Sequence, residues 1–380
     1  MLTLRAAKRR SSGSSVGEPF SLEVEIEQEE GRTLVVVGES GAGKSTLLRL
    51  LAGLDKPDRG HISLAGATWF DEERSGGTWI PPWARPIGYV GQDYALFPHL
   101  TVWENVAFGL DARGWSRRDM RDRVAAVLDR LGITALSERR PREISGGQQQ
   151  RAALARALAP TPRLLLLDEP LSALDQRTRQ EIRGELKSVL DEVGCTTVLV
   201  THAPVEALLF GDRIAVLEEG RLTQLGDRDD LLRRPRSSYV ASLLGVNLFR
   251  GTVVHDPGSP AGVVRVRTKE GSLLVPDPGV RGDVFVTVNP RDVTLYLTPP
   301  VGSAQNIFHG EVAEVVPQPP DGERVRVVLR TRPPLVTEVT QAAAAALTLR
   351  AGAWIHAGFK ATGTSVYGAP AVRATGIAGT

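Results

Sequence analysis

The chain has almost no cysteine: Cys195 is the only one among 380 residues, so no disulfide can form within the chain. This usage fits a reducing compartment. Cys195 comes just before the apolar residues 197–200, where a thiol is more often a small core filler than a nucleophile. The thiol is therefore a poor candidate for catalysis.

Long apolar runs are also missing from the sequence. No stretch approaches the roughly 18 residues that a helix needs to cross a bilayer. The N-terminus has no apolar segment suited to a signal peptide. We therefore expect the chain to remain in the cytoplasm.

Neither sign of charge is in excess. The 46 basic and 44 acidic residues give a formal net charge of +2. Proteins that bind nucleic acid usually carry a clear basic excess, so we expect no nucleic-acid partner. The length favours two domains, each large enough to bury a core, and the 42% of hydrophobic residues is ordinary for globular proteins.

The most informative stretch is rich in glycine and follows a short apolar run. Residues 38–46 read Gly-Glu-Ser-Gly-Ala-Gly-Lys-Ser-Thr, after the apolar residues 34–37 and before an apolar helical pattern. Strand, loop and helix in this order form a phosphate cradle, because glycines let backbone N–H groups turn toward an anion. Lys44 adds a cation, and the Ser45 hydroxyl can ligate Mg²⁺. A plain Gly/Ser turn would need neither. The predicted phosphate-binding residues are Gly38, Ser40, Gly41, Gly43, Lys44, Ser45 and Thr46.

Further polar side chains follow apolar strand patterns. These are Gln92, the pair Asp168 and Glu169, and His202. Nucleotides bind at the carboxyl ends of strands in parallel sheets, so we expect these side chains at one edge. There Asp168 and Gln92 could hold Mg²⁺ together with Ser45, or Gln92 could orient a water molecule. Glu169 could polarise an attacking water, and His202 could donate a hydrogen bond to a γ-phosphate, so the predicted catalytic residues are Glu169, His202 and Gln92. Alone, a strand-end glutamine or histidine would fit a structural role equally well.

A second group of glycines opens another predicted helix. Ser145 is suited to cap a helix that starts at Gly146, Gly147 and Gln148 and continues through Leu158. The open N–H groups of its first turn and the helix dipole would attract an anion. In isolation, the same residues also fit a capped helix start with glycines for close packing.

The strand and helix patterns divide the chain into two predicted domains. Residues 1–244 read as an α/β domain in which an antiparallel layer precedes the central strands. From residue 245 onward, short strands punctuated by Gly and Pro predict a small all-β barrel, with one alanine-rich helix at 341–349.

Together these motifs resemble the ATP-binding subunit of an ABC transporter over residues 1 to about 244. The order of motifs carries the resemblance: Walker A at 38–46, the Q-loop residue Gln92, the signature at 145–148, the Walker B pair Asp168 and Glu169, the D-loop ending at Asp175, and the switch residue His202. Residues 96–110 are similar to bacterial importer ATPases of the sulfate, molybdate, maltose and polyamine group. The resemblance implies a P-loop ABC ATPase fold with a mixed sheet core, an antiparallel β layer and a helical subdomain.

This resemblance also implies how such a chain works. Two copies pair head to tail, so that Ser145 and Gly147 of one clamp the γ-phosphate of ATP held by Lys44 of the other. Mg²⁺ is the cofactor, and Glu169 is the base. Two integral-membrane permease subunits and an extracytoplasmic substrate-binding protein complete the transporter. We therefore expect a homodimer on the cytoplasmic face of the inner membrane.

Two departures from the family pattern are visible. The family usually stacks an aromatic ring on adenine from the N-terminal hairpin, but residues 1–19 contain no aromatic and Phe20 is a poor positional match. Ile144 precedes Ser145 where leucine is commoner, a packing change that should cost little. The sequence therefore assigns no contact to adenine.

The C-terminal region resembles the OB-like (TOBE) module of molybdate importer ATPases, best over residues 302–367. The matching segments are 303–306, 310–312, 335–340 and 358–362, after the similar linker strand at 288–293. The resemblance implies an ATPase that powers the import of an oxyanion, most of all molybdate, with sulfate/thiosulfate or tungstate as the alternative substrates. An alternative from another functional class is a soluble ABC ATPase that has no role in transport. An oxyanion at the module could take donors from Ser303, Asn306, Lys360 and Thr362. A purely structural barrel with a solvated lysine fits these residues as well, and Gln305 stands where small molybdate-binding proteins often have arginine.

Overall fold

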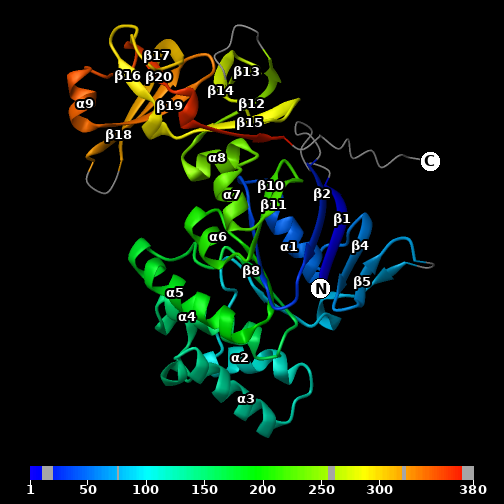
Figure 1. Cartoon of the computed structure of the whole chain (residues 1–380). Coiled ribbons are helices and arrows are strands. Elements are labelled where there is room, and N and C mark those ends of the chain that lie inside the picture. Colours follow the sequence, from blue (N-terminus) through cyan, green and yellow to red (C-terminus); the bar gives the residue numbers. More distant parts are fainter. Residues whose placement is uncertain (11–19, 75–76, 256–261, 319–321, 370–380) are drawn as a thin grey trace. The chain divides into compact units, whose positions relative to one another are not determined.

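The structure is a computed structural model of the chain, and it describes residues 1–10, 20–74, 77–255, 262–318 and 322–369. The chain divides into two compact units, Met1–Leu231 and Leu232–Thr380 (Figure 1). Helix α8 (Ser238–Leu244) belongs to the second unit, where it contacts strand β12 (Asn247–Val254). The second unit begins at Leu232, 13 residues before the start predicted at residue 245, and so includes α8.

The first unit is built on one 11-stranded sheet with the order β6-β5-β4-β1-β2-β11-β10-β3-β9-β8-β7. The strands are β1 (Leu2–Arg10), β2 (Phe20–Gln28), β3 (Thr33–Val37), β4 (Arg59–Leu64), β5 (Ala67–Asp71), β6 (Thr78–Trp79), β7 (Ile87–Val90), β8 (Leu164–Asp168), β9 (Thr196–Val200), β10 (Arg213–Glu218) and β11 (Arg221–Gly226). Strands β10, β3, β9, β8 and β7 run parallel, whereas β1, β2, β4 and β5 pair antiparallel. This mixed sheet confirms the predicted α/β class.

Burial explains the two kinds of strand. All five residues of β3 and the four leucines of β8 are buried, because the parallel core is covered on both faces. Strand β2 alternates instead: Leu22, Val24 and Ile26 are buried, while Glu25 and Glu27 between and after them are exposed. The antiparallel layer thus has one face in the core and one in solvent.

The helices of the first unit follow the parallel strands or form a separate helical part. They are α1 (Lys44–Ala52), α2 (Val102–Asp111), α3 (Arg117–Arg130), α4 (Gly146–Leu158), α5 (Gln176–Val193), α6 (Pro204–Phe210) and α7 (Arg228–Arg233), the last crossing the boundary between the units. Short 3-10 turns are η1 (Pro82–Ala84), η2 (Thr134–Leu136) and η3 (Pro141–Glu143). Helices α2, α3 and α4 pack on one another as the predicted helical subdomain (Figure 1). Among the described residues, no helix combines the length and the apolar character that crossing a membrane requires.

The second unit contains two antiparallel five-stranded sheets with the orders β14-β13-β12-β15-β21 and β16-β20-β17-β18-β19. The remaining elements are β13 (Val263–Thr268), β14 (Ser272–Pro276), β15 (Asp283–Val288), η4 (Pro290–Asp292), β16 (Thr294–Tyr296), β17 (Asn306–Gln318), β18 (Arg324–Arg330), β19 (Leu335–Thr340), α9 (Gln341–Ala346), β20 (Trp354–Phe359), η5 (Ala361–Gly363) and β21 (Thr364–Gly368). Both sheets contribute to one apolar core, with Val266 and Val286 from the first and Val327 and Ile355 from the second. The all-β prediction is confirmed, and the alanine-rich helix ends at Ala346.

Candidate nucleotide site

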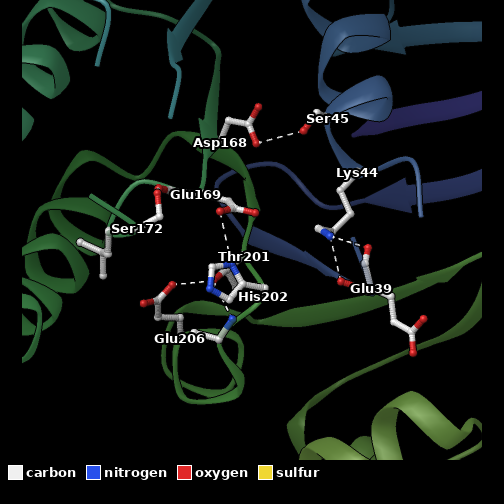
Figure 2. Close-up of polar contacts among 12 residues, drawn as sticks. Glu39, Lys44, Ser45, Asp168, Glu169, Ser172, Thr201, His202 and Glu206 are labelled. Atoms are coloured by element: carbon white, nitrogen blue, oxygen red, sulfur yellow. Dashed lines mark hydrogen bonds and ion pairs between the residues drawn. The ribbon is translucent and has the colours of Figure 1, made fainter. Parts of the chain in front are cut away.

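The glycine-rich loop connects β3 to α1 and holds its own lysine. Lys44 Nζ donates hydrogen bonds to the carbonyl oxygens of Gly38 and Glu39, both at 2.8 Å (Figure 2). Burial lowers the pKa of Lys44, while the negative charges of Glu169 and Asp168 oppose this shift. The ammonium therefore lies over the loop and interacts with both acids at the carboxyl end of β8, Asp168 and Glu169.

Phe20 lies against this loop, although its position in the sequence gave no reason to expect it there. Gly43, the N-cap of α1, has φ 102°, and a Cβ at this position would come 2.7 Å from Cζ of Phe20. A side chain at Gly43 would strain the backbone, and the Phe20 ring would have to shift to make room for it. Phe20 is the aromatic residue that the N-terminal strands bring to the cradle.

The carboxylate of Asp168 meets the start of α1. Its Oδ1 lies 3.4 Å from Ser45 Oγ (Figure 2). Its Oδ2 accepts a hydrogen bond from the hydroxyl of Tyr89 at 3.3 Å. Burial and the neighbouring Glu169 raise the pKa of Asp168, whereas Tyr89, Ser45 and Lys44 lower it. Burial and the same carboxylate raise the pKa of Tyr89 to about 12.

These oxygens fit a small divalent cation. Mg²⁺ prefers hydroxyl and carboxylate oxygens, and a cation here would relieve the repulsion between Asp168 and Glu169. The third predicted ligand, Gln92, follows β7 with an exposed side chain and makes no hydrogen bond to Ser45 or Asp168 within the described residues. The structure thus brings together two of the three predicted magnesium ligands, and Tyr89 donates a hydrogen bond to one of them, Asp168.

Glu169 and His202 face each other across the ends of β8 and β9. His202 Nδ1 lies 3.2 Å from Glu169 Oε2 (Figure 2). The side chain of Glu169 is 21% exposed and that of His202 60%, so the acid is the more enclosed partner. Glu169 has φ +47°, an unfavourable value for a residue with a Cβ, which costs about 1–3 kcal/mol. Its backbone N–H donates to Val200 O at 2.9 Å, and its carbonyl accepts from Ser172 Oγ at 2.8 Å, and these bonds help to hold the strained turn.

A buried carboxylate supports the turn that carries His202. Thr201 Oγ1 donates to Glu206 Oε2 at 2.5 Å, and Arg183 of α5 reaches Glu206 Oε1 at 3.3 Å. Thr201 and Glu206 are 2% and 4% exposed, and Thr201 Oγ1 also accepts from Ala203 N at 3.0 Å. The backbone on both sides of His202 is therefore fixed by groups that the sequence did not single out.

The signature residues open α4 as expected from their spacing. Ser145 and Gln148 form a capping box: Ser145 Oγ accepts from Gln148 N at 3.4 Å, and Gln148 Oε1 accepts from Ser145 N at 2.9 Å. Ser145 and Gly146 are exposed, whereas a Cβ at the buried Gly147 would come 3.2 Å from Cδ1 of Ile182. Gly147 thus permits close packing on α5, and the exposed turn before it makes no hydrogen bond to the cradle among the described residues of this chain.

Asp175 caps α5. Its Oδ1 accepts from the backbone N–H groups of Arg177 and Thr178, both at 3.1 Å. The hydrogen bonds that Asp175 accepts, first of all from Thr178, lower its pKa. The residue therefore fixes the start of the helix against which Gly147 packs.

The predicted oxyanion residues of the second unit have different surroundings. Asn306 is 3% exposed, and its amide is paired with the backbone of Leu274: Nδ2 donates to Leu274 O at 2.8 Å and Oδ1 accepts from Leu274 N at 2.7 Å. Asn306 therefore links β17 to β14 of the other sheet. Its amide is not available to an anion, so its prediction as an oxyanion donor is corrected. Ser303, Lys360 and Thr362 are exposed. Their two segments are linked by a 3.0 Å hydrogen bond from Ala361 N to Gln305 Oε1.

Comparison with known proteins gives matches for both units. The ABC transporter family model matches residues 22–172, and the TOBE domain model matches residues 302–366. A molybdate/tungstate import ATP-binding protein of Pyrococcus horikoshii is 37% identical over 348 residues, which are 91% of this chain and 95% of that protein. A spermidine/putrescine import ATP-binding protein of Frankia alni is 43% identical over 309 residues, 78% of this chain and 64% of that protein. A trehalose/maltose import ATP-binding protein of Thermococcus litoralis is 42% identical over 258 residues, 67% of each chain.

Solved structures of ATP-binding cassettes resemble about 60% of the chain. A dimeric ATP-binding cassette in a post-hydrolysis state, bound to ADP and Pi, has a TM-score of 0.50 and 33% identity, over 60% of this chain and 98% of that one. A component of an ABC transporter complex from Clostridium perfringens has a TM-score of 0.53 and 29% identity, over 62% of this chain and 91% of that one.

Proposed function

Because this chain belongs to the ABC transporter family of import ATP-binding subunits, which hydrolyse ATP, we propose that it powers the import of an oxyanion, first of all molybdate. The observation that carries the proposal is the extent of one relative. The molybdate/tungstate protein aligns with 91% of this chain, and the TOBE module lies within the second unit. The polyamine and maltose relatives are slightly more identical, at 43% and 42%, over shorter stretches of 309 and 258 residues.

For the working form we propose a homodimer with two nucleotides at the interface. Ser145 and Gly146 are exposed at the start of α4 and lie outside their own cradle, which leaves this turn open to a second copy. A helix start with open N–H groups attracts phosphate. A related cassette is dimeric with ADP and Pi bound. Permease subunits and an extracytoplasmic binding protein complete the proposed assembly at the cytoplasmic membrane face.

Within each site the residues divide the work of hydrolysis. Lys44 exchanges the carbonyl oxygens of Gly38 and Glu39 for phosphate oxygens. Bound at Ser45 and Asp168, Mg²⁺ would neutralise phosphate charge. Glu169 accepts a proton from the attacking water, and His202, in contact with Glu169, donates a hydrogen bond to the γ-phosphate.

In the second unit we propose Ser303, Lys360 and Thr362 as the oxyanion donors. The three are exposed, and the hydrogen bond between Gln305 and Ala361 keeps their segments together. A lysine ammonium with hydroxyl donors suits a tetrahedral oxyanion. Asn306 is not part of the set, since its amide is paired with Leu274.

Reconstitution tests the transported substrate directly. The chain would be combined with candidate permease and binding proteins, and ATP hydrolysis would be measured with the binding protein loaded in turn with molybdate, tungstate, sulfate, spermidine or maltose. We expect stimulation by molybdate and tungstate. Stimulation by spermidine or maltose alone would contradict the oxyanion proposal while leaving the ATPase assignment intact.

A further inference from the structure

Arg85 is one of the largest fully buried side chains of the described residues, with 1% exposed. Its Nη1 donates to the carbonyl oxygens of Leu50 and Leu51 at 2.9 and 2.6 Å, and its Nε donates to Ile80 O at 2.9 Å. Its Cζ lies 5.3 Å from the ring centroid of Trp69. A buried cation thus binds the last turn of α1, the helix whose first turn belongs to the phosphate cradle.

No carboxylate of the described residues forms an ion pair with Arg85, so the helix itself supplies the counter-charge. The carbonyl end of a helix carries partial negative charge, which a buried arginine complements. Burial lowers the pKa of Arg85 to about 10, which leaves the guanidinium charged at neutral pH. The turn after α1 is shaped for it: Gly53 has φ +74°, and a Cβ there would lie 2.8 Å from Cζ and Nε of Arg85.

The same helix is held at its other end by the metal-site residues. Ser45, in the first turn of α1, contacts Asp168, and Asp168 contacts Tyr89 of β7. Arg85 lies two residues before β7, and its carbonyl accepts from Ile87 N at 2.9 Å. Helix α1 and strand β7 are therefore linked twice, through Arg85 at one end and through Asp168 at the other.

We propose that Arg85 is a positioning residue for the nucleotide and metal site: it fixes the end of α1 to the start of β7 and so holds Ser45 in register with Asp168 and Tyr89. The inference rests on the proposed Mg²⁺ site and is independent of the transported substrate. It concerns a side chain that is too deeply buried to reach the nucleotide. Its effect should therefore appear in the contribution of Mg²⁺ to nucleotide affinity.

The test is equilibrium binding of a fluorescent ADP analogue to the full-length chain, with excess Mg²⁺ and with EDTA. Arg85→Met removes the hydrogen bonds and keeps an unbranched side chain. We expect about a tenfold loss of affinity with Mg²⁺, and less than about a threefold loss with EDTA. If the ratio of the affinity with Mg²⁺ to the affinity with EDTA were the same for Arg85→Met as for the wild type, the inference would be overturned. If the wild-type chain bound the nucleotide equally well with Mg²⁺ and with EDTA, the proposed metal site would be wrong, and this inference would be wrong with it.

Arg123, which is only partly buried, provides a control because it also donates hydrogen bonds to the last carbonyl groups of another helix. Its Nε and Nη2 donate to Ala159 O and Leu158 O at 2.8 and 2.9 Å, at the end of α4. Arg123→Met should lower the melting temperature as Arg85→Met does, without changing the Mg²⁺ dependence of binding. If Arg85→Met and Arg123→Met changed the Mg²⁺ dependence of nucleotide binding equally, Arg85 would have only a structural role.

If Arg85→Met does not fold, Arg85→Lys decides the question. One ammonium keeps the charge but cannot bind the end of α1 and Ile80 O with the same fork of donors. We expect a loss of about threefold, with Mg²⁺ only. An Arg85→Lys chain with the Mg²⁺ dependence of the wild type would refute the inference.

Discussion

Replacement of Glu206 by alanine should destabilise the first unit far more than replacement of an exposed partner in an ion pair. The Glu206 carboxylate accepts from Thr201 at 2.5 Å and from Arg183 at 3.3 Å, and its side chain is 5% exposed. The variant would leave the Arg183 charge, which is 18% exposed, without its acceptor. Breaking a buried pair in this way costs about 3–5 kcal/mol. Glu206→Gln keeps the shape and one acceptor oxygen, so its cost should be about 1–2 kcal/mol.

The assay is urea unfolding of the full-length chain, with Glu185→Ala as the control. Glu185 pairs with Arg151, but its side chain is 50% exposed, and such a pair contributes about 1 kcal/mol or less. Hydrolysis by the folded Glu206→Gln protein should also fall, because Thr201 precedes His202 and loses part of its fixed geometry. Equal destabilisation by Glu206→Ala and Glu185→Ala would refute this account of the buried carboxylate.

Three further outcomes follow from the contacts described. Asn306→Ala should destabilise the second unit by about 1–3 kcal/mol, since it leaves both backbone groups of Leu274 unpaired, yet ATP affinity should stay unchanged in equilibrium binding. Burial raises the pKa of Asp168 in the folded chain, so the charged carboxylate is destabilising there, and Asp168→Asn should raise the free energy of unfolding at pH 7. This gain should vanish in acid, where Asp168 is protonated in the folded and the unfolded chain alike. A variant that is less stable than the wild type at pH 7 would contradict this prediction. Lys44→Ala should weaken binding of ATP about tenfold or more, and unchanged affinity by calorimetry would exclude the cradle as the phosphate site.

Features with a local or periodic signal could be predicted from the sequence. Four consecutive leucines before Asp168 predict a strand buried on both faces, and β8 is one. The rule that parallel strands bring their carboxyl ends to one edge predicted that Glu169 and His202 would lie together, and they are in contact. Both expectations needed only a strand pattern and a polar residue after it.

Contacts without a local pattern could not be predicted. Tyr89 and Asp168 are 79 positions apart, and Arg85 reaches carbonyl groups 34 and 35 positions away, with no spacing that marks either contact. Phe20, the first residue of β2, lies near Gly43 because β2 begins at the end of the sheet where β3 leads into the cradle. The alternation of residues in β2 does not reveal this. The type of a polar side chain also does not identify its hydrogen-bond partner. The amide of Asn306 could bind an anion or the backbone of a neighbouring strand, and in the structure it binds the backbone of Leu274.

The central claim is that two copies of this chain enclose ATP, each supplying Ser145 to the cradle of the other. Light scattering of the Glu169→Gln variant with ATP and Mg²⁺ tests it most directly, because without the base the nucleotide should persist and hold the pair together. We predict a dimer with ATP, and a monomer when Ser145→Arg is added to the same variant. A Ser145→Arg double variant that still dimerises with ATP, or a wild-type chain that hydrolyses ATP as a monomer, would contradict the account.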